Sequence, residues 1–205
     1  MSLLERLNPL ALRERFNDPP VWEPEMLNDR ITLMKREPAA AAVLVPLVAR
    51  PEGMSVLLTQ RTAHLNDHAG QISFPGGRCE TSDASHIHTA LRETEEEIGL
   101  LSQHIEVVGQ LPVYTTATNF HVTPIVAIVH PPFELTLDAF EVAEAFEVPL
   151  RFLMDADNHQ KKSFTTEHGE RFFYAMPWVS ESGREYFIWG ATAAMLRNLY
   201  QFLSL

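Results

Sequence analysis

Three glutamates, Glu93, Glu96 and Glu97, have the spacing of one face of a helix. On a helical wheel of about 100° per residue with Glu93 at zero, Glu97 falls at about 40° and Glu96 at about 300°. Three like charges within one turn repel one another, at a cost of roughly a few tenths of a kcal/mol per pair. A divalent cation such as Mg²⁺, which prefers oxygen ligands, would reverse that cost. The spacing is therefore compatible with a metal site, although a solvated acidic face is the commoner explanation of a glutamate-rich helix.

The helix that carries these glutamates is expected over residues 84–98. Ser82 or Asp83 could cap its N-terminus, because a short oxygen-bearing side chain accepts hydrogen bonds from the first free N–H groups. Gly99 suits the position after the last turn, where the backbone usually becomes left-handed. The residues expected on the buried face lie away from the glutamates; they are Ile87, Leu91, Thr94 and Ile98.

The stretch from Phe74 to Leu100, FPGGRCETSDASHIHTALRETEEEIGL, resembles the Nudix box. The family pattern is G-x5-E-x7-R-E-U-x-E-E-x-G-U, in which U is an aliphatic residue. Thr94 replaces one aliphatic residue, Asp83 stands near the place of the first glutamate, and the spacer before Arg92 is one residue longer. The matching residues are Gly77, Arg92, Glu93, Glu96, Glu97, Gly99 and Leu100. The resemblance implies an α/β Nudix fold and a hydrolase that cleaves diphosphates.

Two further segments resemble the coenzyme A pyrophosphatase branch of that family. Residues 57–77, LLTQRTAHLNDHAGQISFPGG, follow L-L-T-x-R-[SA]-x3-R-x3-G-x3-F-P-G-G, with Thr62 and Asn66 as departures. Residues 141–150 follow E-V-x-x-x-F-x-V-P-L, and the branch also tends to carry the longer spacer in the box. The resemblance implies cleavage of coenzyme A or its derivatives to 3′,5′-ADP and 4′-phosphopantetheine.

The expected chemistry is Mg²⁺- or Mn²⁺-dependent hydrolysis, in which the ion neutralises phosphate charge and lowers the pKa of a bound water. Glu93 and Glu97 are expected as primary metal ligands, because positions i and i+4 share one face, and Glu96 as a third ligand or a contact through water. Arg92 is expected to pair with a nearby carboxylate and to fix its rotamer. The family often places its general base outside the box, and Glu141, then Glu144, are the candidates; either could instead line an exposed surface.

The expected substrate contacts surround the glycine turn at Gly76 and Gly77, where the backbone can pass close to a ligand. A 3′-phosphate needs cationic donors, and Arg61 and Arg78 flank this turn. Either arginine could instead form a surface ion pair. The histidines of the preceding loop, His64 and His68, are expected to contact substrate or to be exposed.

A chain of 205 residues and 23.2 kDa suits one domain with a full core. Its net charge of −11 argues against a general nucleic-acid or anionic-membrane binder, because both need a basic surface. The single cysteine, Cys79, fits a reducing compartment, and no signal peptide or apolar span is evident. The expected location is therefore the cytoplasm.

Residues 1–36 are expected to form an N-terminal extension with a short amphipathic helix to about Phe16, and residues 37–205 a single Nudix domain. The extension could cap the domain or join a partner in a homodimer, and capping is the default expectation. Strands are expected at 39–48 and 55–60, joined as a hairpin, and at 71–74, 105–114 and 121–129, with a strand pair over 163–174. A strand end is expected at Val148, a short helix at 149–153 and a terminal helix at 191–203, whose buried face would contain Ala194, Leu196, Leu199 and Leu203. A mixed β-sheet in an α/β/α sandwich follows.

Two other functions are compatible with this sequence. The chain could hydrolyse a different nucleoside diphosphate derivative, such as ADP-ribose or a dinucleotide, and the missing arginine at Asn66 favours this reading. It could also be a catalytically silent domain that binds a nucleotide as a sensor. The three clustered glutamates argue against the sensor, because a binding-only domain does not need them.

Overall fold

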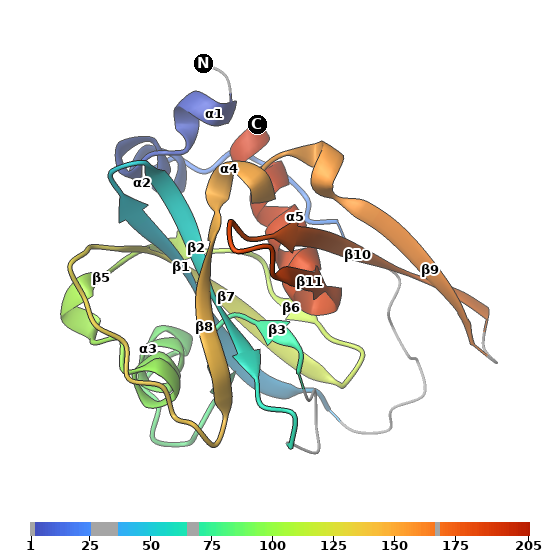
Figure 1. Ribbon diagram of the computed structural model, residues 1–205, viewed down its shortest axis with the longest axis horizontal. Helices are drawn as coiled ribbons and strands as arrows, with labels where there is room; N and C mark the ends of the chain where they lie inside the picture. Colours follow the sequence, from blue (N-terminus) through green and yellow to red (C-terminus); the bar gives the residue numbers. More distant parts are fainter. Residues whose placement is uncertain (1–2, 26–36, 65–69, 167–168) are drawn as a thin grey trace.

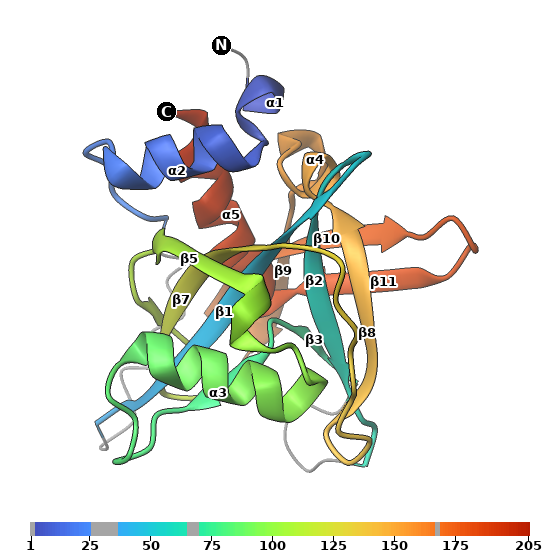
Figure 2. The same cartoon turned by 90° about the vertical axis from the view of Figure 1, so that its left-hand side faces the viewer.

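The computed structural model describes residues 3–25, 37–64, 70–166 and 169–205 of the chain. Within this part, a mixed sheet is covered by helix α3 (His86–Ile98) on one face, and by helix α5 (Gly190–Ser204) with a smaller sheet on the other (Figures 1 and 2). The chain thus has the α/β/α arrangement expected from its sequence.

The larger sheet is built around β1 (Ala39–Arg50), which pairs antiparallel with β2 (Gly53–Arg61) and parallel with β7 (Phe120–Val129). The β1–β2 hairpin was expected from the turn at residues 51–53. The other strands of this sheet are short or lie at its margins: β3 (Ile72–Ser73), β4 (Gly76–Arg78), β5 (Ile105–Gln110), β6 (Tyr114–Thr115) and β8 (Val142–Pro149).

Strand β1 is buried on both faces, because alternate residues point to opposite sides of a sheet. Ala42 and Leu44 pack with Ala90 of α3, whereas Val45 and Leu47 belong to the larger core that contains Leu196 of α5. A strand that is buried on both faces has a nearly continuous run of apolar residues, and the sequence of β1 has such a run. The core predicted for the terminal helix is confirmed; its members Ala194, Leu196, Leu199 and Leu203 are all buried.

A second, three-stranded antiparallel sheet contains β9 (Gln160–Thr166), β10 (Gly169–Val179) and β11 (Glu185–Trp189), in the order β11-β10-β9. The strand pair expected over 163–174 is β9 and the first half of β10. The short helix expected after Pro149 is α4 (Leu150–Leu153). Two single turns of 3₁₀ helix lie at Ser102–His104 and Ala156–Asn158.

Three local expectations were wrong. Helix α3 starts at His86 and its N-cap is Ser85, not Ser82 or Asp83, because the Asp83 carboxylate binds Arg92 instead. Ile87 is exposed, whereas Glu97 takes a buried position on the same helix. The branch motif over 141–150 forms a whole strand, β8, and not only a strand end at Val148, because it pairs along β2.

The N-terminal segment forms α1 (Leu3–Arg6) and α2 (Pro9–Asn17), which lie at the end of the molecule beside α5 (Figure 2). Arg13 of α2 forms an ion pair with Glu106 of β5, with Nε 2.6 Å from Oε1. The Phe16 ring packs on Phe202 of α5 with a centroid distance of 4.7 Å. The described residues of this segment therefore cap their own domain.

We expect Leu12→Ala to reduce the free energy of unfolding by about 2–5 kcal/mol, because Leu12 is fully buried between α2 and the core. Leu10→Ala on the same helix is the matched control, since Leu10 is 63% exposed and should change stability by no more than about 0.5 kcal/mol. Urea unfolding of both variants measures the difference. Equal effects would mean that the segment does not hold the position seen here.

Candidate active site

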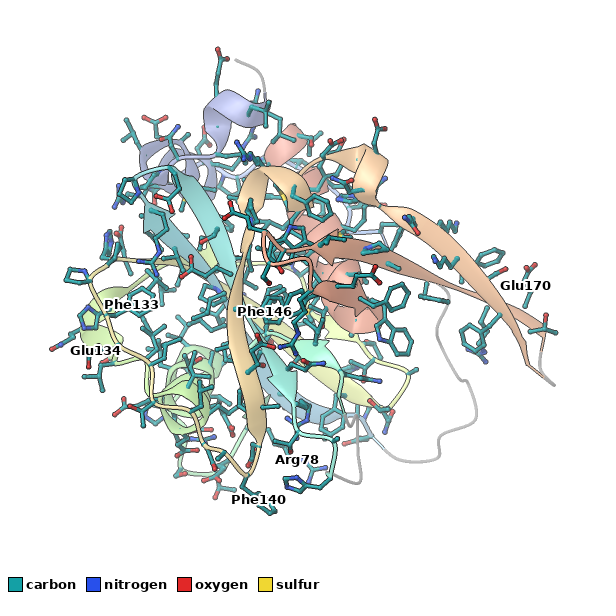
Figure 3. All side chains as sticks on the ribbon, in the orientation of Figure 1. Arg78, Phe133, Glu134, Phe140, Phe146 and Glu170 are labelled. Carbon is teal, nitrogen blue, oxygen red and sulfur yellow. The ribbon has the colours of Figure 1, made fainter. Side chains whose placement is uncertain are left out.

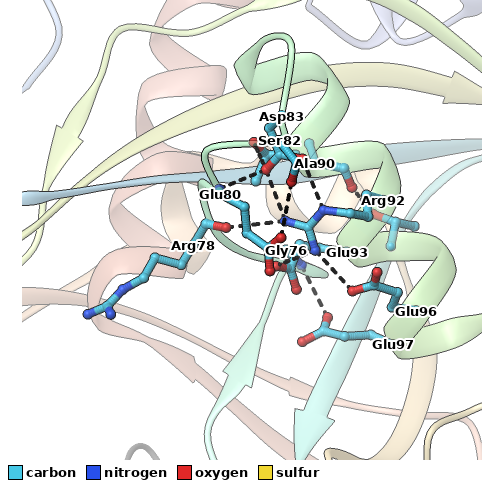
Figure 4. A network of polar contacts seen from close by, with 12 residues as sticks. Gly76, Arg78, Glu80, Ser82, Asp83, Ala90, Arg92, Glu93, Glu96 and Glu97 are labelled. Atoms are coloured by element: carbon cyan, nitrogen blue, oxygen red, sulfur yellow. Dashed lines mark hydrogen bonds and ion pairs between the residues drawn. The ribbon is translucent and has the colours of Figure 1, made fainter.

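The glycine turn of β4 lies directly against the glutamate face of α3 (Figure 4). The backbone N–H of Gly76 donates a hydrogen bond to Oε2 of Glu97, at 3.1 Å. Gly77 is close to Glu93, since a Cβ at Gly77 would lie 2.5 Å from Cδ of that carboxyl group. The turn and the helix therefore form one site, in which the missing side chain at Gly77 makes room for the Glu93 carboxylate.

The two glycines should respond differently to alanine. At Gly76, φ is +148° and a Cβ would lie 2.5 Å from the backbone of Ala42 and Val43, so we expect Gly76→Ala to destabilise the fold. At Gly77 the obstacle is the flexible end of Glu93, so Gly77→Ala should fold but displace that carboxylate. Thermal melts and Mn²⁺ titrations of both variants test this contrast. Equal melting temperatures for the two variants would contradict it.

Arg92 is the centre of the polar network drawn in Figure 4. Its Nε and NH2 donate to the two oxygens of Asp83, both at 3.0 Å, and its NH1 donates to Glu93 at 2.9 Å and Glu96 at 3.0 Å. Its NH2 also donates to the carbonyl of Arg78, at 3.3 Å. Arg92 therefore pairs with carboxylates, as expected, and ties the loop before α3 to the helix.

Asp83, which the sequence suggested as a helix cap, instead binds Arg92. Its side chain is only 2% exposed and accepts further hydrogen bonds from the Glu80 N–H and the Thr89 hydroxyl. The hydrogen bonds from Arg92 hold the pKa of Asp83 well below its usual range, and Asp83 in turn raises the pKa of Arg92. The longer spacer before Arg92 was the sequence signal for this role, because the loop places the Asp83 carboxylate against the Arg92 guanidinium.

Glu97 is buried, and Arg61 and Glu141 lie beside it. NH1 of Arg61 is 3.7 Å from Oε1 of Glu97, and NH2 of Arg61 is 3.8 Å from Oε2 of Glu141. The pKa of Glu97 is raised to about 7, chiefly by burial and in smaller part by the carboxylates of Glu141 and Glu93, while the Gly76 N–H and Arg61 oppose the rise. Burial also raises the pKa of Glu93, although Arg92 opposes the shift.

The second base candidate, Glu144, lies apart from this group. It accepts a hydrogen bond from the Tyr186 hydroxyl at 2.9 Å, and NH2 of Arg184 lies 2.6 Å from its other oxygen. Both partners belong to the β10–β11 region, which covers the sheet face opposite α3 (Figure 2). The structure brings Glu141, but not Glu144, to the glutamates of α3.

Only some of the other residues expected to contact substrate lie near the glutamates. The Arg78 side chain points away from the glutamates (Figure 4), with its guanidinium carbon 5.3 Å from the centroid of the Phe120 ring. His64 packs on Phe140 at a centroid distance of 4.9 Å. His68 and Asn66 lie outside the described residues, so the expected role of His68 stays a prediction. Of the two arginine candidates, only Arg61 lies beside the buried carboxylate.

The donor chemistry at this site fits a divalent cation. Glu93, Glu96 and Glu97 supply carboxylate oxygens, which Mg²⁺ and Mn²⁺ prefer, and the raised pKa of Glu97 marks a place where a cation would stabilise the charged form. Among the described residues, however, no three acidic, His or Cys side chains already form a group that could hold an ion. NH1 of Arg92 contacts both Glu93 and Glu96, so these side chains must reorient to join Glu97 at an ion.

A proton and a metal ion would compete for Glu97, so metal affinity should depend on pH. With a pKa of about 7, the ionised fraction of Glu97 rises from about one tenth at pH 6 to about nine tenths at pH 8. We expect Mn²⁺ affinity to rise about tenfold over this range, as measured by calorimetry. Glu97→Gln should lack this component, and a pH-independent wild-type affinity would contradict the expectation.

Comparison with known proteins defines the family to which this chain belongs. Residues 38–169 match the NUDIX domain, and the Nudix hydrolase NudL of Salmonella heidelberg (strain SL476) is 39% identical over 176 residues, covering 85% of this chain and 88% of the relative. NudL of Escherichia coli (strain K12 / DH10B) is 39% identical over 171 residues, covering 83% and 84%. Both relatives are themselves uncharacterized. The chain belongs to the Nudix family and is a hydrolase acting on diphosphate bonds.

The fold comparison agrees with this family. RenU, a Nudix hydrolase from M. smegmatis, superposes with a TM-score of 0.51 at 23% identity, covering 64% of this chain and 81% of that structure. Nudix hydrolases generally use divalent ions such as Mg²⁺ or Mn²⁺. In the described part of the chain, no helix is long and apolar enough to cross a membrane.

Proposed function

We propose that this enzyme hydrolyses the diphosphate of coenzyme A or its derivatives, giving 3′,5′-ADP and 4′-phosphopantetheine or its acyl form. One observation supports this above the others. Arg61 and Glu141, from the two separate segments that resemble the coenzyme A branch, lie together beside Glu97 of the Nudix box. Residues far apart in the chain thus converge at the site where a diphosphate would be cleaved.

In the proposed mechanism, Glu93 and Glu97 would hold the divalent ion, and Glu96 would be a third ligand or a contact through water. When bound, the ion neutralises charge on the diphosphate and lowers the pKa of water. Glu141 accepts the proton of the water that attacks phosphorus, while the P–O bond of the anhydride breaks. Asp83 and Arg92 position the helix face, because their hydrogen bonds fix the loop and two of the carboxylates.

Arg61 is the proposed contact for a substrate phosphate. Its guanidinium carries five N–H donors in a planar fork that suits phosphate oxygens. It lies between two carboxylates at distances of 3.7 and 3.8 Å, which are too long for good hydrogen bonds, so its donors can be redirected. Arg78 and the backbone of Gly76 and Gly77 are proposed as outer contacts. A cytoplasmic location stays a prediction from the single Cys79.

A substrate panel tests the proposal. Coenzyme A, ADP-ribose and diadenosine polyphosphates are incubated with Mg²⁺ or Mn²⁺, and products are separated by chromatography. The expected result is the highest kcat/KM for coenzyme A, with 3′,5′-ADP as one product. Preference for another substrate would keep the hydrolase and reject the coenzyme A assignment. Nucleotide binding without turnover of any substrate would favour the sensor reading.

A further inference from the structure

The three-stranded sheet has an outer face that turns aromatic side chains to solvent. Residues alternate along each strand, and one set points to the core; its members Tyr174, Met176, Tyr186 and Ile188 are buried. The register pairs Ala175 with Trp189 and Pro177 with Phe187, which places the other set on the opposite side. We call that side the outer sheet face; its aromatic residues are Phe164, Phe173, Phe187 and Trp189.

The four aromatic rings form a continuous row across all three strands. Ring centroids are 5.9 Å apart for Phe164 and Phe173, 5.6 Å for Phe173 and Trp189, and 6.4 Å for Trp189 and Phe187. Phe164 is 49% exposed, Phe187 44% and Trp189 38%. Isolated apolar side chains on a surface are ordinary, but a contiguous exposed patch marks an interaction site.

Two charged residues of this face, Arg171 and Glu185, lie toward opposite ends of the strands. Arg171 pairs in register with Phe164 at one end, whereas the ammonium group of Lys162 lies over the Phe187 ring, 5.3 Å from its centroid. Glu185 pairs with Val179 at the other end. The two ends are eight residues apart along β10, roughly 26 Å at about 3.3 Å per residue, so Arg171 and Glu185 cannot meet within one chain. Within the described ranges, neither residue has an ion-pair partner.

This pattern is what a two-fold symmetric contact requires, because such a contact presents one patch to an identical patch. A two-fold axis that crosses the strands at the Ala175–Trp189 pair exchanges the Arg171 end with the Val179–Glu185 end. Each cationic end of one copy then faces the Glu185 end of the other, while the aromatic row lies against its own copy at the centre. The same face against an acidic partner would leave Glu185 opposed by like charge.

We propose that the outer sheet face is the contact between two copies of this chain. The contact buries the four aromatic rings and forms two equivalent ion pairs between Arg171 of one copy and Glu185 of the other. It is distinct from the homodimer through the N-terminal segment that the sequence suggested, because the described part of that segment packs on its own domain and lies away from β9 and β10 (Figure 1). Figure 3 shows how far the end of this sheet, near Glu170, extends from the body of the protein.

The test is the mass of the full chain in solution, measured by sedimentation equilibrium. The expected species is a dimer of the 23.2 kDa chain. Glu185→Arg and Arg171→Glu should each weaken dimerisation at least about tenfold, and the double variant should restore it, because the swapped charges pair again. Glu14→Arg, an exposed charge reversal on α2, is the matched control and should leave the mass unchanged.

Three results would overturn the proposal. The wild-type chain could stay monomeric at every concentration tested. A dimer could form but resist both single charge reversals, or weaken in them without recovery in the double variant. Finally, Leu10→Lys, on the exposed side of α2, could dissociate the dimer while Glu185→Arg does not, which would place the contact at the N-terminal segment. Melting temperatures of the variants, expected to equal one another in monomeric form, exclude misfolding as the cause.

Discussion

Glu97→Gln is expected to reduce kcat/KM for the preferred substrate by at least about a hundredfold and to weaken Mn²⁺ binding. Glutamine keeps the shape of the side chain and an oxygen that can accept from the Gly76 N–H, so the turn should hold its position. It removes the negative charge at a buried position that is only 6% exposed, where water cannot substitute for it. The measurements are steady-state kinetics and Mn²⁺ calorimetry on the same preparations.

Glu95→Gln is the control for this change. Glu95 lies on the same helix, is exposed, and makes no side-chain contact with the glutamate group, so the variant should match the wild type in activity and metal affinity. If Glu97→Gln kept full activity, Glu97 could not be a metal ligand. If it lost activity with unchanged metal affinity, its role would lie in positioning the glycine turn, and the ligand set would need revision.

The second large effect is expected at Arg61, where a substitution should change the affinities for metal and for substrate in opposite directions. The Arg61 guanidinium is the cation that offsets Glu97 and Glu141 in the structure. Removing it in Arg61→Gln should strengthen Mn²⁺ binding several-fold, because the ion no longer competes with a positive charge. The same variant should raise KM about tenfold, which corresponds to ~1.4 kcal/mol, because it loses a donor to the substrate phosphate.

Arg184→Gln is the matched control for Arg61. Arg184 is also an arginine beside a glutamate of β8, but it pairs with Glu144 on the sheet face opposite α3, so neither Mn²⁺ affinity nor KM should change. A fall in both Mn²⁺ affinity and substrate affinity in Arg61→Gln would contradict the proposed competition. An unchanged KM would restrict Arg61 to balancing charge between the two carboxylates.

Several parts of this protein follow from the sequence alone, because they depend on local spacing. The positions of Glu93, Glu96 and Glu97 on one helix follow from helical geometry, and Gly99 ends that helix in a left-handed conformation with φ of 68°. The β1–β2 hairpin and the terminal helix were likewise predicted, since each has its own turn or periodic pattern. The family membership followed from the same short-range motif.

Only the tertiary structure decided which distant residues meet. Glu141 lies just before β8 and Glu144 within it, and only the pairing of β8 with β2 shows that Glu141 is the one beside Arg61 and Glu97 while Glu144 meets Arg184 and Tyr186. Asp83 could have been a helix cap by its residue type, but the loop delivers it to Arg92, where two hydrogen bonds stabilise its charge. Such outcomes depend on strand register and on competition between partners, which a linear sequence does not contain.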